Sequence, residues 1–236
     1  MSKNRIWELD AFRGLCVIGM VIVHFVFDLV TLFGLVDWAY NSVFTFIMNW
    51  GGILFLLISG ICATLGTRSV RRGLIVFGCG MLVTAVTAGM YLLGMAHPII
   101  IIYFGVLHCL GVCMMLWCFF KKLPTWALGV LGGILVIAGF WIRDLWVEFP
   151  YLIWLGLTTP TFATSDYFPL LPNLGFFLLG AVIGRTLYRR KETLLPKGNV
   201  KNPIIRFCTA CGRHSLMIYL VHQPVLSLVI MLLAKL

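Results

Sequence analysis

Long apolar segments dominate the chain, and short polar stretches separate them. Seven of these segments are about 20 residues long, the length that a helix needs to cross the hydrocarbon core of a membrane. They lie at 10–34, 42–66, 73–95, 98–119, 124–142, 170–188 and 213–234. The pattern predicts an all-α, polytopic integral membrane helical bundle of about seven transmembrane helices, which we expect to form a single domain over 1–236.

The composition excludes a soluble protein. Hydrophobic residues make up 61% of the chain, charged residues make up 11%, and the mean hydropathy is +1.02. A soluble domain is usually about half apolar and a quarter charged. A chain of this size cannot bury so much apolar surface inside itself, so the remainder must face lipid.

The distribution of basic residues predicts the orientation of the spans. The formal net charge is +10, and sixteen of the 18 Lys and Arg residues fall on the side of the membrane that holds the N-terminus. Arg143 and Lys235 are the two exceptions. Cytoplasmic connections collect Lys and Arg, so we expect the N-terminus in the cytoplasm, the C-terminus outside, and a multi-pass protein of the plasma (inner) membrane. Because topology explains the positive charge, no nucleic acid partner is expected.

Two connections are long. Residues 143–169 are rich in Trp and Tyr, a composition typical of a structure lying among the lipid headgroups on the outer side. Residues 189–212 are basic and are expected to form a cytoplasmic loop.

The first span concentrates charged and polar side chains within an apolar run: Asp10, Arg13, His24 and Asp28. The eleven-residue step from Arg13 to His24 is close to three full turns of helix and covers about 16 Å, and Asp28 lies one turn further. The four side chains therefore share one stripe of the helix, which must face the bundle or a water-filled cavity.

Two interpretations of this stripe stay open. A His with a carboxylate four residues later is a plausible general base, because Asp28 can orient the ring of His24 and raise its basicity. The same pair can instead be a buried polar contact that holds helices together.

Further polar residues in later spans are candidates for the same site. His108 and His222 lie inside apolar segments, where a buried histidine acts either in function or as a hydrogen-bonding link between helices. Arg13, Arg71, Arg72 and Arg213 lie at the cytoplasmic ends of spans, and their guanidinium groups suit a phosphorylated ligand, although topology alone also places cations there. Cys208 and Cys211 form an isolated CxxC motif without a second pair, so no metal is expected.

Three stretches resemble a known family. They are RIWELDAFRGLCVIGMVIVHFVFD at 5–28, DYFPLLPNLG at 166–175 and GRHSLMIYLVHQP at 212–224. Together they resemble the DUF1624 family, the bacterial relatives of the catalytic domain of heparan-alpha-glucosaminide N-acetyltransferase. The resemblance covers nearly the whole chain, and it implies an acyl-CoA-dependent acetyltransferase. The eukaryotic heparan enzyme has Asn at the position of His24, and heparan itself is therefore not the acceptor that we expect.

The first span is also similar to the membrane acyltransferase-3 family, whose first helix carries an Arg, ten further residues and a His. That resemblance implies that His24 is the catalytic residue and that Arg13 lies on the side of the acyl-CoA donor. Acetyl-CoA or another acyl-CoA is then the co-substrate. We expect the acceptor to enter from the outer face past Asp166 and Asn173.

The leading hypothesis is therefore a membrane acyltransferase that moves an acyl group, in the first place acetyl, from cytoplasmic acyl-CoA to an amino or hydroxyl group of a sugar or glycolipid. His24 is the expected general base, assisted by Asp28. Arg13, Arg71, Arg72 and Arg213 are expected to bind the donor, and Asp166, Asn173, His108 and His222 the acceptor. The alternatives are a transporter or channel for a proton-coupled or anionic small molecule, and a scaffold without chemistry. Membrane lipid is an expected partner, and a homodimer is compatible with the sequence.

Overall fold

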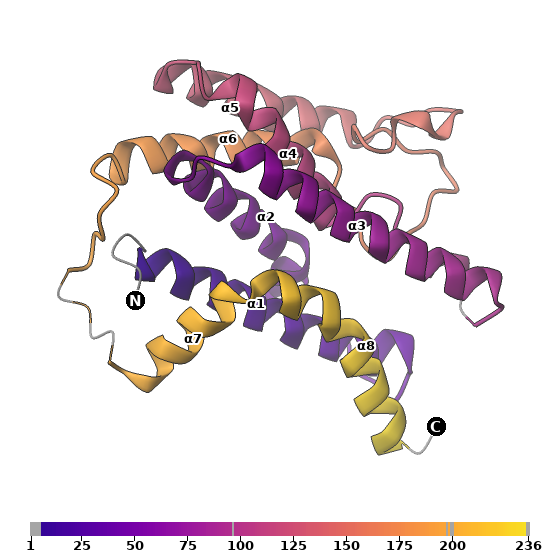
Figure 1. Cartoon of the computed structure of the whole chain (residues 1–236). Helices are drawn as coiled ribbons and strands as arrows, with labels where there is room; N and C mark the ends of the chain where they lie inside the picture. Colours follow the sequence, from indigo (N-terminus) through magenta and orange to yellow (C-terminus); the bar gives the residue numbers. More distant parts are fainter. Residues whose placement is uncertain (1–5, 96, 197, 199–200, 235–236) are drawn as a thin grey trace. The chain divides into compact units, whose positions relative to one another are not determined.

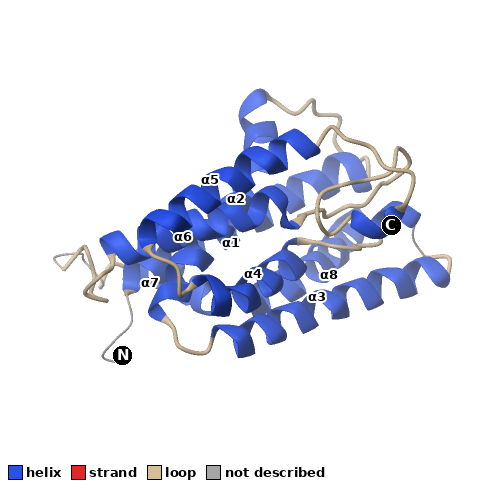
Figure 2. Ribbon diagram, turned by 90° about the horizontal axis from the view of Figure 1, so that it is seen from above, coloured by secondary structure: helices blue, strands red, loops and turns tan. Residues whose placement is uncertain are grey.

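The computed structural model describes residues 6–234 except 96, 197, 199 and 200. Among the basic residues used to predict the orientation, Lys3, Arg5, Lys197 and Lys235 lie outside the described residues. The α-helices are α1 (Trp7–Phe27), α2 (Ser42–Leu65), α3 (Ser69–Leu92), α4 (Val106–Phe120), α5 (Thr125–Ile142), α6 (Leu170–Leu187), α7 (Pro203–Arg213) and α8 (Ser215–Ala234). Figures 1 and 2 label these α-helices. A π-helical turn η1 (Asp28–Leu32) continues α1, and two short 3₁₀ turns, η2 (Pro98–Ile100) and η3 (Pro150–Leu152), lie in connections.

The described part of the chain is all-helical and contains isolated β-bridges but no strand. Six of its helices are long and apolar enough to cross a membrane, with α1 and η1 counted together. These six agree with six of the seven predicted spans. The polytopic membrane fold is therefore confirmed.

The fourth predicted span is shorter than expected. It was predicted from residue 98, but α4 begins at Val106 and has 15 residues, about 22 Å of helix. The preceding backbone is held by side chains of α3: the Thr84 hydroxyl donates to the Ile102 carbonyl at 2.5 Å, and the Ile102 N–H donates to the Thr87 hydroxyl at 3.2 Å. Non-helical backbone at membrane depth needs such partners, which explains why this stretch does not have to be helical.

The chain divides into two compact units. One contains Met1–Phe55 and Arg190–Leu236, and we call it the terminal unit; the other contains Leu56–Arg189, and we call it the central unit. The boundary falls within α2. The expectation of a single domain stays a prediction.

In the terminal unit, α7 and α8 pack against α1 (Figure 1). The crossing of α1 and α7 is unusually close, because a Cβ atom at Gly14 would overlap the carbonyl of Cys208 and one at Gly212 would overlap the carbonyl of Asp10. Only glycine permits this approach of two backbones. The basic composition of residues 189–212 predicts a loop, so the helix α7, which begins in this segment, is not among the elements expected from the sequence.

In the central unit, α3 packs against α4, and α5 packs against α6 (Figure 2). Both pairs are antiparallel: Gly73 lies against Gly111 while Gly80 lies against His108, and Gly132 lies against Gly175 while Gly139 lies against Pro172. The carboxyl-terminal half of α2 runs parallel to α6, with Gly60 close to Phe177. Small residues at each contact allow helices to pack closely in lipid.

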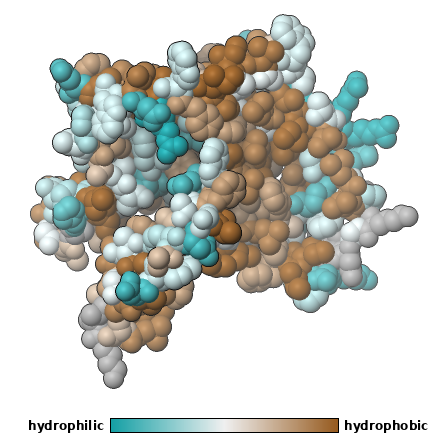
Figure 3. Space-filling view, turned by 180° about the vertical axis from the view of Figure 1, so that it is seen from behind, coloured by the Kyte–Doolittle hydropathy of each residue, from teal (hydrophilic) through white to brown (hydrophobic). Residues whose placement is uncertain are grey.

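Many of the largest apolar side chains lie on the surface of the helices. Leu92 is 81% exposed and Trp141 is 84% exposed. Figure 3 shows hydrophobic side chains over much of the face that it presents. Such a surface is stable in lipid and would aggregate in water.

Candidate functional site

The polar stripe of α1 faces α7 and α8. Asp10 contacts Arg213, His24 contacts His222, and Asp28 contacts Gln223. The order of these contacts shows that α1 and α8 run parallel. The side chains that share the stripe of α1 therefore contact residues of the same two helices, α7 and α8. All of these residues belong to the terminal unit.

At the first of these contacts, the Asp10 carboxylate forms ion pairs with the guanidinium groups of Arg13 and Arg213. Asp10 lies 3.7 Å from Nη1 of Arg13 and 3.4 Å from Nε of Arg213. The close crossing at Gly14 and Gly212 is what brings α7 and its last residue, Arg213, to the first turns of α1. Two cations therefore share the Asp10 carboxylate, while the other acid of this turn, Glu8, accepts from the Thr193 hydroxyl and the Leu194 N–H.

The His24 ring is oriented by its own helix. Nδ1 lies 2.9 Å from the carbonyl oxygen of Met20, which can only accept, so Nδ1 carries the proton and donates it. The neutral ring then has its lone pair on Nε2, and within the described residues Nε2 makes no hydrogen bond. The expectation that Asp28 orients this ring is wrong in the structure. The backbone carbonyl one turn earlier is the nearer acceptor, and Asp28 is engaged elsewhere.

His222 lies beside His24. The two ring centroids are 4.8 Å apart and the planes meet at 82°, an edge-to-face contact. Nδ1 of His222 donates to the Tyr219 carbonyl at 2.6 Å, whereas its Nε2 is buried without a hydrogen bond in the described structure. When neutral, the two histidines therefore have the same tautomer, with the proton on Nδ1 and the lone pair on Nε2.

Asp28 is completely buried at the point where α1 passes into the π-helical turn η1. Both of its carboxylate oxygens accept from Nε2 of Gln223, at 2.8 and 2.9 Å. The other end of that amide, Oε1, is buried without a partner in the described structure. Turns of this π type are frequent at functional sites.

The remaining predicted residues lie in the central unit. Arg71 and Arg72 are in the first turn of α3. His108 caps α4: Nδ1 accepts from the Gly105 N–H at 3.2 Å, and Nε2 lies 3.3 Å from the Thr84 hydroxyl. Because that hydroxyl gives its proton to Ile102, it accepts from Nε2 of His108. Both ring nitrogens of His108 therefore have structural partners, and its predicted contact with the acceptor remains a prediction.

Asp166 and Asn173 also make contacts that stabilise the fold. Asp166 accepts from the Val106 N–H at 3.2 Å, which satisfies a backbone donor in the first turn of α4. Asn173 is buried and donates to the Pro169 carbonyl at 2.8 Å. Their predicted roles in acceptor binding remain predictions.

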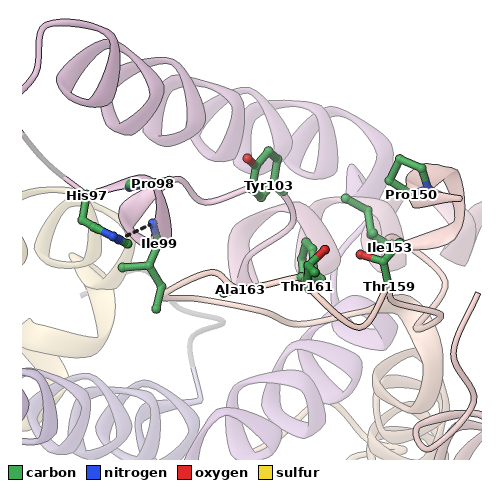
Figure 4. Close-up of a pocket in the computed structure, with 10 residues that line it drawn as sticks. His97, Pro98, Ile99, Tyr103, Pro150, Ile153, Thr159, Thr161 and Ala163 are labelled. Atoms are coloured by element: carbon green, nitrogen blue, oxygen red, sulfur yellow. Dashed lines mark hydrogen bonds between the residues drawn. The ribbon is translucent and has the colours of Figure 1, made fainter. Parts of the chain in front are cut away.

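A pocket of about 510 Å³ opens among the connections of the central unit (Figure 4). Its lining is mostly apolar, with the hydroxyl groups of Tyr103, Thr159 and Thr161 and the ring of His97 among it. Nearby, the Tyr167 hydroxyl donates to the Ile153 carbonyl at 2.6 Å, and burial raises the pKa of Tyr167 to about 12. The sequence analysis did not predict this pocket.

The residue that the sequence analysis missed is Gln223. Gln223 lies between His222 and Pro224 in the middle of an apolar span. A primary amide at this place indicates a hydrogen-bonding partner inside the protein, because polar side chains in lipid need partners. Sequence alone does not show that this partner is Asp28. Within the described residues, no three His, Cys, Asp or Glu side chains cluster as metal ligands would.

The model of one protein family, described as heparan-alpha-glucosaminide N-acetyltransferase, catalytic, matches residues 5–224. The chain belongs to this family. No curated protein and no solved structure matches it.

The family match includes all the residues of the polar stripe and their partners on α7 and α8. Together with the six long apolar helices, it shows a membrane protein of an acetyltransferase family.

Proposed function

We propose that this chain transfers an acyl group, in the first place acetyl, from acyl-CoA to an amino or hydroxyl group of a sugar or glycolipid. The acyl-CoA binds from the cytoplasmic face and the acceptor enters from the outer face of the plasma membrane. The observation that carries this proposal is the free Nε2 of His24, placed inside a membrane domain of an acetyltransferase family.

His24 is the general base of the proposed reaction. The Met20 carbonyl keeps the proton on Nδ1, so Nε2 is available to receive one. As the acceptor nitrogen or oxygen attacks the thioester carbonyl, its proton passes to Nε2. The carbon–sulfur bond breaks, the acyl group stays on the acceptor, and the leaving thiolate of CoA takes the proton from Nε2 of His24, which restores the base. His222, edge-on to His24, borders the same place.

The cations at the start of α1 bind the donor in this proposal. Arg13 and Arg213 are held by Asp10, and a guanidinium group binds phosphate oxygens through paired hydrogen bonds. CoA carries several phosphate oxygens, and its pantetheine arm is long enough to extend from there along α1. Arg71 and Arg72 are proposed as further contacts to the donor.

The test is to separate donor binding from transfer in protein reconstituted in nanodiscs. Calorimetry should give micromolar binding of acetyl-CoA, weakened about tenfold or more in Arg13→Ala, a change of about 1.4 kcal/mol. Arg189→Ala, which removes an exposed cation elsewhere in the chain, is the matched control and should bind normally.

His24→Ala should bind acetyl-CoA as the wild type does but lose transfer to methyl α-D-glucosaminide by about a hundredfold or more. CoA release is the readout, and retained donor binding shows that the variant is folded. Absence of acetyl-CoA binding in folded wild-type protein, or full transfer by His24→Ala, would contradict the proposal.

A further inference from the structure

Two buried hydrogen-bond acceptors lie side by side in sequence on α8 without a donor. They are Nε2 of His222 and Oε1 of Gln223. Nδ1 of His222 already donates to the Tyr219 carbonyl, so Nε2 of the neutral ring offers only a lone pair. Buried polar atoms are normally paired, so two unpaired ones call for an explanation, and a ligand that completes their hydrogen bonding is one.

Asp28 determines which end of the Gln223 amide is left free. The carboxylate accepts with both oxygens and has nothing to donate, so it binds the amide nitrogen, the only donor that Gln223 has. With Asp28 completely buried, the amide is held in this orientation and Oε1 points away from the carboxylate. Asp28 therefore positions an acceptor, although it does not orient His24.

The same region offers a third acceptor. Nε2 of the neutral His24 ring carries the lone pair for the same reason as that of His222, and the two rings are in contact. The acyl carbonyl and the phosphates of a CoA donor are acceptors themselves and do not match this group of atoms, so within the donor only the amide N–H groups and the hydroxyl of the pantetheine arm could pair with them. A group with several N–H or O–H bonds, such as an amine or neighbouring hydroxyls, matches it.

We propose that Nε2 of His222 and Oε1 of Gln223 form the recognition site for the hydrogen-bond donors of the acceptor substrate, with Asp28 as the positioning residue that turns the Gln223 amide. This inference rests on the proposed function and adds to it the class of group that is recognised and the residues that recognise it. It also places the acceptor next to the base, His24.

Three sugars test the chemistry on wild-type protein in nanodiscs, with ¹⁵N-labelled histidine. Methyl α-D-glucosaminide carries an amine and hydroxyls, methyl α-D-glucoside carries hydroxyls alone, and the fully O-methylated glucoside carries no donor. The Nε2 resonance of His222 should shift saturably with the first sugar, or with the first two, and stay unchanged with the third. A response to the amine alone identifies an N-acceptor site, and an equal response to both identifies a hydroxyl site. No response to either, or an equal response to the O-methylated sugar, would overturn the proposal.

Two variants in one background test the role of Gln223. In Asp28→Asn, either end of the Gln223 amide can pair with the new amide. Adding Gln223→Glu restores a fixed acceptor, because the Asn nitrogen donates to one carboxylate oxygen and leaves the other free. Adding Gln223→Met removes the acceptor in a side chain of similar length. The dissociation constant of the glucosaminide should be about tenfold higher in the Met variant than in the Glu variant.

Acetyl-CoA binding separates this inference from the proposed function. It should be equal in the two double variants, since the acceptors are not assigned to the donor. Equal sugar affinity in both folded variants, or a loss of acetyl-CoA affinity in place of sugar affinity, would overturn the assignment. If wild-type protein bound no acetyl-CoA but its His222 resonance still responded to the sugars, the transferase proposal would fail while the recognition site stood.

Discussion

His24, His222 and His108 are all histidines in apolar helices, but their ring nitrogens have different partners. His24 and His222 each donate from Nδ1 to a carbonyl of their own helix, and the lone pair remains on Nε2. His108 accepts at Nδ1 from the Gly105 N–H and donates from Nε2 to Thr84. Within the described residues, His24 and His222 therefore each have one ring nitrogen without a hydrogen bond, whereas both ring nitrogens of His108 are hydrogen-bonded within the protein.

This difference predicts the tautomers of the three rings. In ¹⁵N-histidine spectra at pH values where the rings are neutral, His24 and His222 should be protonated at Nδ1 and His108 at Nε2. Single His→Asn variants assign the signals. Protonation of His24 at Nε2 would remove the basis for its role as the base, and the signal of His108 serves as the internal control.

At the scale of elements, the site depends on how closely α7 approaches α1. Gly14 and Gly212 let the two backbones touch, which sets Arg213 beside Asp10. This crossing does not follow from the sequence, because α7 lies in a basic segment whose composition predicts a loop.

Gly14→Ala should separate the two helices, since the new Cβ atom overlaps the backbone of Cys208 and a backbone cannot move aside as a side chain can. We expect a loss of about 1–3 kcal/mol in stability, seen as a lower midpoint of thermal unfolding in detergent, together with weaker acetyl-CoA binding.

Gly19→Ala in the same helix is the matched control, because nothing lies within 4 Å of its Cβ position. Alanine is the better helix former by about 1 kcal/mol, so this variant should unfold at the same temperature or higher. Equal losses in the two variants would show that the close crossing does not determine stability.

At the scale of the whole molecule, the directions of packed helices agree with alternating crossings of a membrane. Helices α1 and α8 run parallel in the terminal unit; in the central unit α3 and α4 run antiparallel, as do α5 and α6, and α2 runs parallel to α6. Seven crossings, each reversing the direction, give this set of directions. We therefore predict that the short helix α4 crosses the membrane together with the non-helical residues that precede it.

Reporter fusions test this topology. Alkaline phosphatase fused after Ala234 should be active in the periplasm, whereas the same reporter fused after Arg190 should be inactive because that position is expected in the cytoplasm. Green fluorescent protein at the two positions should give the opposite result. Activity of the phosphatase at both positions, or at neither, would contradict the seven-crossing arrangement.

The sequence by itself determined the class of protein and most of the spans. Apolar segments of membrane length form helices in lipid, because a helix pairs every backbone N–H and C=O within the segment itself. It also determined that Asp10, His24 and Asp28 lie along one face of the first helix, because that follows from 3.6 residues per turn.

Only the tertiary structure decided which partners those residues meet. Hydrogen bonds between side chains distant in sequence depend on the packing of helices, which no spacing within one helix encodes. Gln223, 195 residues after Asp28, takes the carboxylate that the sequence analysis assigned to His24. His24 is oriented by the Met20 carbonyl and not by Asp28. A backbone carbonyl one turn earlier in the helix can accept from a histidine ring when packing turns the ring toward that carbonyl.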